Sequence, residues 1–180
     1  IEECQAAVQG ASVTGLPIVL TLSIETNGRT MMGITPSDLV ALQPDLPVTL
    51  AAYGTNCGLG ASEVIAAIVN MRQAADLVGV EPILVAKGNC GIPEWVDGKI
   101  CYSGTPELMA NYAQMAIDAG ARIIGGCCGT SPKHVAVMRQ AIDNHTKGSK
   151  PSLEKIESEL GVITSLSLYT HLTLPTNREV

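Results

Sequence analysis

The chain has 180 residues, of which 46% are hydrophobic and 16% charged, and its formal net charge is −6 at pH 7. This composition suffices to bury a core and lacks the low hydrophobicity of disordered proteins. The lysines and arginines are dispersed, which argues against nucleic acid as a partner, because phosphate binding needs clustered positive charge. Neither a run of about 18 apolar residues nor a signal peptide is present, so we expect a soluble, cytoplasmic protein without a membrane partner.

Four short apolar, β-branched segments alternate with helix-like segments, which is the pattern of parallel βα units. The predicted strands are 17–24, 47–53, 82–87 and 121–125. The predicted helices after them begin at Pro36 with Thr35 as N-cap, at Glu63 with Ser62 as N-cap, at Pro106, and at His134. A helix-like segment, 2–10, precedes the first strand, and Asp97-Gly98 predicts a small hairpin. The chain is therefore predicted to be an α/β protein with about four parallel βα units.

Turns with functional character follow all four predicted strands at their carboxyl ends. This arrangement suits a (βα)8 TIM barrel better than an open sheet, which has one switch point for its ligand site. Four units are half of such a barrel, whose full length is about 250 residues. The chain also begins without methionine, inside a helix-like segment. We therefore predict that residues 1–147 form the C-terminal half of a barrel and that an N-terminal half is missing.

The remaining residues are predicted to lie outside this unit. Segment 148–163 is predicted to be a linker followed by a short amphipathic helix from Leu153 to Leu160. The tail, 164–180, alternates apolar and polar residues, which predicts a strand or an ordered arm, yet it also resembles translated adapter read-through of non-native origin. Both interpretations stay open, and no function is placed in the tail, His171 included.

Six unevenly spaced cysteines indicate free, buried or metal-bound thiols rather than a disulfide framework. Cys127 and Cys128 follow the fourth strand, and their adjacent Cα atoms lie about 3.8 Å apart, below the roughly 4.4 to 6.8 Å of an ordinary disulfide. Cys57 follows the second strand, so all three thiols can converge on one edge of a parallel sheet. Three protein ligands with an open fourth position are typical of catalytic zinc. Cys57, Cys127 and Cys128 are therefore the predicted metal ligands.

Other arrangements of these side chains stay open. Cys90, after the third strand, and His134, in the first turn of the last predicted helix, are the alternative fourth ligands, which would make the zinc structural. We interpret Cys90 as a small buried thiol and His134 as an exposed or capping residue that points away from the strand ends. Cys127 and Cys128 can also serve a thiol-redox module without metal.

Two further cysteines, Cys4 and Cys101, have no partner signal and are interpreted as structural.

The cysteine turns resemble those of the homocysteine S-methyltransferase family over about residues 1–145. The matching turns are G-T-N-C-G at 54–58, G-G-C-C-G-T at 125–130 followed by Pro132 and His134, N-G-R-T at 27–30 with Gly33, and G-N-C-G-I-P at 88–93. Within the family, segments 87–102 and 104–109 resemble bacterial betaine-homocysteine methyltransferase-like proteins. Two departures stand out: the family's N-terminal half is absent, and Cys90 stands where the family often has alanine.

This resemblance implies a zinc-dependent (βα)8 barrel enzyme of methionine biosynthesis. It implies an S-methyltransferase that moves a methyl group from a small onium donor, betaine-like by preference, to the thiolate of homocysteine. Cys57, Cys127 and Cys128 would hold the zinc, and Asn56 and Glu25 would position polar groups of the substrates, although Asn56 can equally hold its own turn. A homo-oligomer is compatible with the sequence. We expect the 180-residue chain alone to show little or no turnover, because much of the pocket would lie in the missing half.

Overall fold

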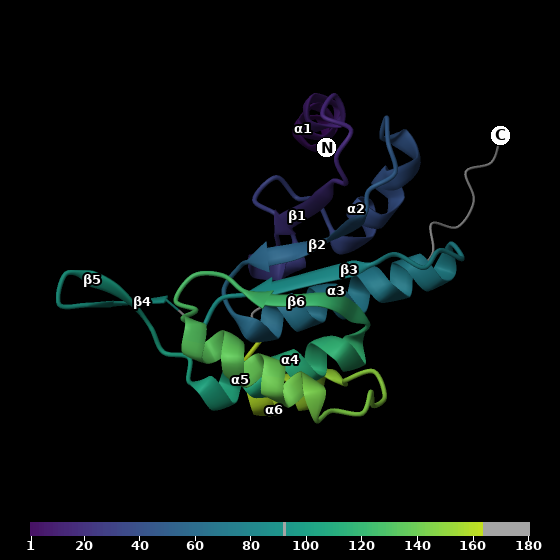
Figure 1. Ribbon diagram of the computed structural model, residues 1–180. Coiled ribbons are helices and arrows are strands. Elements are labelled where there is room, and N and C mark those ends of the chain that lie inside the picture. The colour runs from purple at the N-terminus through teal and green to yellow at the C-terminus, as the bar shows by residue number, and fades with distance from the viewer. Residues whose placement is uncertain (92, 164–180) are drawn as a thin grey trace.

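A computed structural model describes residues 1–91 and 93–163, and it is built around a four-stranded parallel sheet (Figure 1). The strands are β1 (Val19–Ser23), β2 (Ala52–Cys57), β3 (Leu84–Gly88) and β6 (Ala121–Gly126), in the spatial order β1-β2-β3-β6. Each strand is followed by a helix, so the prediction of four parallel βα units is confirmed. The complete barrel stays a prediction.

The helices of the described residues are α1 (Glu2–Ser12), α2 (Pro36–Leu42), α3 (Ala61–Leu77), α4 (Pro106–Ala119), α5 (Pro132–Asp143) and α6 (Leu153–Leu160), with short 3-10 turns η1 (Thr26–Gly28) and η2 (Gln43–Asp45). The predicted hairpin is also present, as β4 (Pro93–Val96) paired antiparallel with β5 (Lys99–Tyr102). Asp97 and Gly98 at its tip both have positive φ. Figure 1 shows this hairpin projecting away from the rest of the molecule.

Helices α2 and α4 begin where predicted, whereas α3 begins earlier than predicted and α5 begins at Pro132 rather than at His134. Thr35 caps α2 in a capping box with Asp38, and the Thr105 hydroxyl accepts a hydrogen bond from the Leu108 amide of α4. The prediction of Ser62 as a cap is wrong, because α3 begins earlier, with Gly60 as N-cap.

The second strand is longer at its carboxyl end than predicted, and it begins at Ala52 rather than at 47. The segment 54–60 is predicted to be a turn, yet Gly54 to Asn56 pair with both β1 and β3, and Cys57 pairs with β3. A Cβ on Gly54 would overlap the backbone of Val85, so the glycine permits close approach of two strands rather than a turn. The strand therefore continues to Cys57.

Helix α3 forms the centre of the core. Every residue from Val64 to Val69 is fully buried, because the helix lies between the sheet and helices α2, α4 and α6 (Figure 1). A helix that is apolar on all sides can only be stable when it is covered in this way. The core of the described unit is thus the layer of helices below the sheet.

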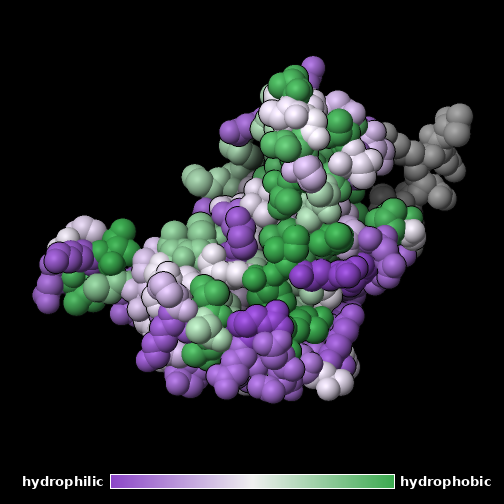
Figure 2. Space-filling view, in the orientation of Figure 1, coloured by the Kyte–Doolittle hydropathy of each residue, from purple (hydrophilic) through white to green (hydrophobic). Residues whose placement is uncertain are grey.

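The edge strands keep apolar residues in contact with solvent. Val19 on β1 is 51% exposed and Ile123 on β6 is 42% exposed. Figure 2 shows hydrophobic residues gathered over the middle of the molecule, where the strands lie, and hydrophilic residues over the helices below them. Exposed apolar edge strands are places where further structure can pack. This is the surface expected if the sheet continues into a barrel.

Segment 148–163 packs closely on the helices. Ile156 and Ile163 are buried, and α6 contacts both α3 and α4. The carboxylate of Asp118 on α4 accepts a hydrogen bond from the Gly148 amide and pairs with His145. The tail from 164 onward, with His171, lies outside the described residues. Within the described part of the chain, no helix combines the length and the apolar character needed to cross a membrane.

Replacing Ile156 with alanine tests whether α6 is part of the folded unit. The side chain is fully buried, so we expect Ile156→Ala to lower the free energy of unfolding by about 2 to 5 kcal/mol. The measurement is urea unfolding followed by circular dichroism. The control is Val162→Ala, whose side chain is 74% exposed; equal stability of the two variants would show that α6 does not contribute to the core.

Candidate metal centre

Three cysteine thiols meet where neighbouring parallel strands end. Cys57 is the last residue of β2, and Cys127 and Cys128 directly follow β6. In the sheet, Cys57 is level with Gly88 of β3, which is level with Gly126 of β6. Strand β3, which lies between β2 and β6, therefore has no side chain at the height of Cys57. The Sγ atoms of Cys57 and Cys127 lie 2.7 Å apart, and each lies 3.9 Å from Sγ of Cys128.

The donor set fits a zinc ion. In a tetrahedral site with Zn–S bonds of about 2.3 Å, sulfur atoms lie about 3.8 Å apart. Two of the three sulfur separations already have this value, and the separation between Cys57 and Cys127 would have to widen. Cys57 and Cys127 are half-buried and Cys128 is exposed, so a fourth ligand can approach from solvent. Among the described residues, these three form the one group of histidines, cysteines and acids compact enough to hold a metal.

The end of β2 has an unusual backbone. Cys57 has φ +56° and Gly58 has φ +67°, both in the left-handed region, which costs about 1 kcal/mol or more for a residue with a side chain. A Cβ on Gly58 would overlap the carbonyl oxygen of Ile24. Only glycine therefore fits at 58, and the surrounding structure must hold Cys57 in its strained conformation.

Asn89 connects the two cysteine turns. The sequence alone did not identify it as a site residue. Its side-chain amide donates a hydrogen bond to the carbonyl oxygen of Gly58 (2.8 Å), and its Oδ1 accepts one from the Cys128 amide (3.1 Å). Asn89 is buried, with 5% of its surface exposed. One side chain thus sets the separation between the turn of Cys57 and the turn of Cys127 and Cys128.

Tyr112 of α4 holds the strands together just before these turns. Its hydroxyl accepts a hydrogen bond from the Gly88 amide (2.9 Å) and donates one to the Gly125 carbonyl (3.3 Å). Burial raises the pKa of the Tyr112 phenol far above its ordinary value, so the hydroxyl stays protonated and keeps its donor role. Tyr112 therefore ties β3 to β6.

The thiols have different acidities. Hydrogen bonding by Cys127 is the main cause that lowers the pKa of Cys57, and the charge of Lys87 adds to the effect. Burial, together with the hydrogen bond to Cys57, raises the pKa of Cys127 to about 11. The pKa of Tyr102 is raised mainly by its hydrogen bond with Cys128. Of these two thiols, Cys57 is thus the more acidic.

The two alternative fourth ligands contact each other rather than the thiol group. Cys90 is buried, and its Sγ lies 3.5 Å from Nε2 of His134 and 3.4 Å from the carbonyl oxygen of Gly104, to which it donates. His134 Nδ1 accepts from the Ser131 amide at 3.0 Å. The capping interpretation of His134 agrees with this geometry. The expectation that the ring points away from the strand ends is wrong, because Nε2 reaches the turn after β3.

The remaining two cysteines differ in burial. Cys4 on α1 is buried, as a structural thiol would be, whereas Cys101 on β5 is exposed.

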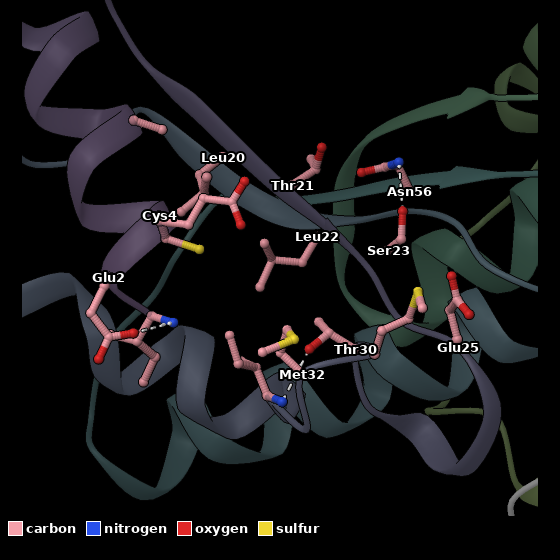
Figure 3. Close-up of a pocket in the computed structure, with 15 residues that line it drawn as sticks. Glu2, Cys4, Leu20, Thr21, Leu22, Ser23, Glu25, Thr30, Met32 and Asn56 are labelled. Atoms are coloured by element: carbon pink, nitrogen blue, oxygen red, sulfur yellow. Dashed lines mark hydrogen bonds and ion pairs between the residues drawn. The ribbon is translucent and has the colours of Figure 1, made fainter.

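A cavity of about 800 Å³ lies beside β1, and its lining extends to Asn56, the residue before Cys57 (Figure 3). Both residues that the sequence suggested for substrate positioning, Glu25 and Asn56, line it. Figure 3 shows Asn56 pointing toward Ser23, and its side-chain amide donates to the Ser23 hydroxyl at 3.3 Å. Asn56 also hydrogen-bonds Cys57, which contributes to the lowered pKa of that thiol. Asn56 therefore lies between the cavity and the thiol group.

Comparison with known proteins agrees with the motifs. The family model for homocysteine S-methyltransferase matches residues 1–142. The chain belongs to the homocysteine S-methyltransferase family. Among curated members, betaine–homocysteine S-methyltransferase 1 of Danio rerio is 27% identical over 158 residues, covering 79% of this chain and 38% of that protein. S-methylmethionine–homocysteine S-methyltransferase of Pongo abelii is 26% identical over 167 residues, covering 86% and 45%.

The chain spans less than half the length of these two relatives. Two solved structures of the homocysteine methyltransferase MmuM from Escherichia coli share its fold. The apo form has a TM-score of 0.59 and the metallated form 0.58, each with 23% identity over 77% of this chain. The match covers 44% and 40% of those chains. At this identity the likeness shows the fold alone.

Replacing Asn89 with alanine tests whether its side chain holds the two turns together. The change would leave a partly buried donor and a partly buried acceptor without their partner, so we expect Asn89→Ala to destabilise the fold by about 1 kcal/mol, the lower end of the range for such groups. We also expect faster hydrogen exchange at the Cys128 amide, measured by NMR. Asn144→Ala, at the exposed end of α5, is the control. Unchanged exchange at Cys128 would show that the contact does not exist in solution.

Proposed function

We propose that this chain carries the zinc site of an S-methyltransferase that moves a methyl group from a small onium donor, betaine-like by preference, to the thiol of homocysteine, giving methionine. The observation that carries the proposal is the convergence of Cys57, Cys127 and Cys128, with Sγ separations of 2.7, 3.9 and 3.9 Å. Membership of the homocysteine S-methyltransferase family supports it.

The chemistry requires a thiolate at neutral pH. A free thiol has a pKa near 8.5, so only a minority of homocysteine is ionised at pH 7. What zinc supplies when bound is a lowered pKa for a thiol that takes the open coordination position. The chain contributes three thiol ligands and an exposed side at Cys128 through which such a thiol can enter.

The transfer itself is a displacement. A bond forms between the homocysteine sulfur and the methyl carbon while the bond from that carbon to the donor's nitrogen or sulfur breaks. The electron pair of the broken bond leaves with a neutral amine or thioether, and the thiol proton has already passed to solvent. A neutral leaving group needs little acid catalysis, so the protein's task is alignment. We assign Asn56 and Glu25 to this task, because both line the cavity along β1 and Asn56 directly precedes Cys57.

The proposed enzyme is larger than this chain. We propose that residues 1–147 are half of a (βα)8 barrel and that four further βα units would cover the cavity along β1. We expect the 180-residue chain alone to turn over little or no substrate.

A thiol-redox module is the second candidate function. The 2.7 Å separation favours Cys57 and Cys127 as the reacting pair rather than the adjacent Cys127 and Cys128, at 3.9 Å. A purified protein without zinc that forms a reversible disulfide between Cys57 and Cys127 would favour this candidate.

Zinc analysis of cysteine variants tests the proposed function. We expect one zinc per chain in the wild type and its loss in Cys57→Ala, Cys127→Ala and Cys128→Ala, measured by mass spectrometry of metals after dialysis. Cys4→Ala is the control, because Cys4 lies on α1, outside the thiol group. Unchanged zinc in all three variants would contradict the proposal. Loss of zinc in Cys90→Ala as well would instead favour a structural zinc with a fourth protein ligand.

A further inference from the structure

A row of polar side chains crosses the open face of the sheet just before the thiols. Ser23 of β1 is level with Asn56 of β2, and Asn56 is level with Lys87 of β3. Successive side chains in a strand point to opposite faces. A Cβ on Gly88, the next residue, would lie 3.2 Å from the ring of Tyr112 on α4. Lys87 therefore points to the face away from α4, the same face as Asn56.

On its other side, Lys87 neighbours a position of β6 that has no side chain. The level position on β6 is Gly125, where an added Cβ would lie 3.8 Å from Cγ of Lys87. The lysine stem thus lies against a strand position without a side chain. Lys87 is half-buried, and among residues 1–91 and 93–163 it forms none of the salt bridges. A partly buried ammonium without an anion is costly, and an anionic ligand would offset that cost.

The net negative charge of a zinc-loaded thiol group would favour a positively charged side chain at position 87. Three thiolates and one zinc dication leave the site net negative, which would repel a substrate carboxylate. Lys87 directly precedes Gly88, the residue of β3 that is level with Cys57. A lysine at the end of β3 can therefore attract an anionic group to a place where the metal site alone would exclude it.

We propose that Lys87 binds the carboxylate of a zwitterionic substrate beside the thiol group, with Asn56 and Ser23 completing the row toward the cavity. The inference rests on the proposed function, because it names the chemical class that the same site takes. Homocysteine and a betaine-like donor both have a carboxylate. The shared chemistry is a small zwitterion whose reactive sulfur or methyl group lies a few bonds from its carboxylate.

Matched probes test the inference on the full 180-residue chain. Homocysteine is compared with 3-aminopropanethiol, which lacks the carboxylate, and glycine betaine with choline, in which a hydroxymethyl group replaces it. Binding is measured by isothermal titration calorimetry with zinc-loaded and metal-free protein. The variants are Lys87→Met, Lys87→Arg, which keeps the charge, and the control Lys99→Met on the exposed strand β5.

We expect Lys87→Met to weaken binding of one carboxylate probe by about tenfold or more, the scale of a lost charged hydrogen bond, without affecting its carboxylate-free partner. Lys87→Arg should retain most of the affinity and Lys99→Met all of it. The probe pair that responds identifies whether the acceptor or the donor is bound.

A wild-type chain that binds neither carboxylate probe in preference to its partner would overturn the inference. Equal losses for both members of a pair in Lys87→Met, which mark a structural effect, or no loss at all would also overturn it. Zinc content separates this result from the proposed function. A chain that binds zinc without discriminating carboxylates contradicts only the role of Lys87, whereas one that discriminates carboxylates without binding zinc contradicts only the metal site.

Discussion

The site depends on the level at which β2, β3 and β6 end. Because Cys57, Gly88 and Gly126 lie at one height in the parallel sheet, thiols separated by 70 residues in the sequence meet over a strand end that has no side chain. Asn89 and Tyr112 hold this arrangement with buried or partly buried hydrogen bonds between the strand ends. Each such hydrogen bond adds little net stability. Breaking one would leave a polar group without a partner away from water, which is costly, and this cost keeps the strand ends at their observed separation.

The same edge brings together the groups that a methyl transfer to sulfur would need. The thiol group is open to solvent at Cys128, the cavity along β1 begins at Asn56, and Lys87 supplies positive charge between β2 and β6. In the proposed enzyme, adjacent but different residues would activate the nucleophile and position the substrate. The exposed edge of β1 bounds the cavity on the side where the proposed barrel would continue.

The sequence predicted the four βα units because their strands are apolar and β-branched and three of their four helices begin at threonine or serine followed by proline. The convergence of the three thiols could be predicted because the carboxyl ends of parallel strands lie at the same edge of a sheet. The end of β2 could not be predicted, because Gly54 resembles a turn residue until Val85 of the next strand is seen to fill the space of its side chain. The roles of Asn89 and Lys87 depend on strand register, which no local pattern encodes.

The most direct test of the zinc site is the number of sulfur ligands on the metal with and without homocysteine. Zinc K-edge X-ray absorption on the zinc-loaded chain counts these ligands. The account predicts three sulfurs and one lighter atom in the absence of substrate, and four sulfurs once homocysteine is added. Four sulfurs before homocysteine is added, or no change after it, would contradict an open position for the substrate thiol.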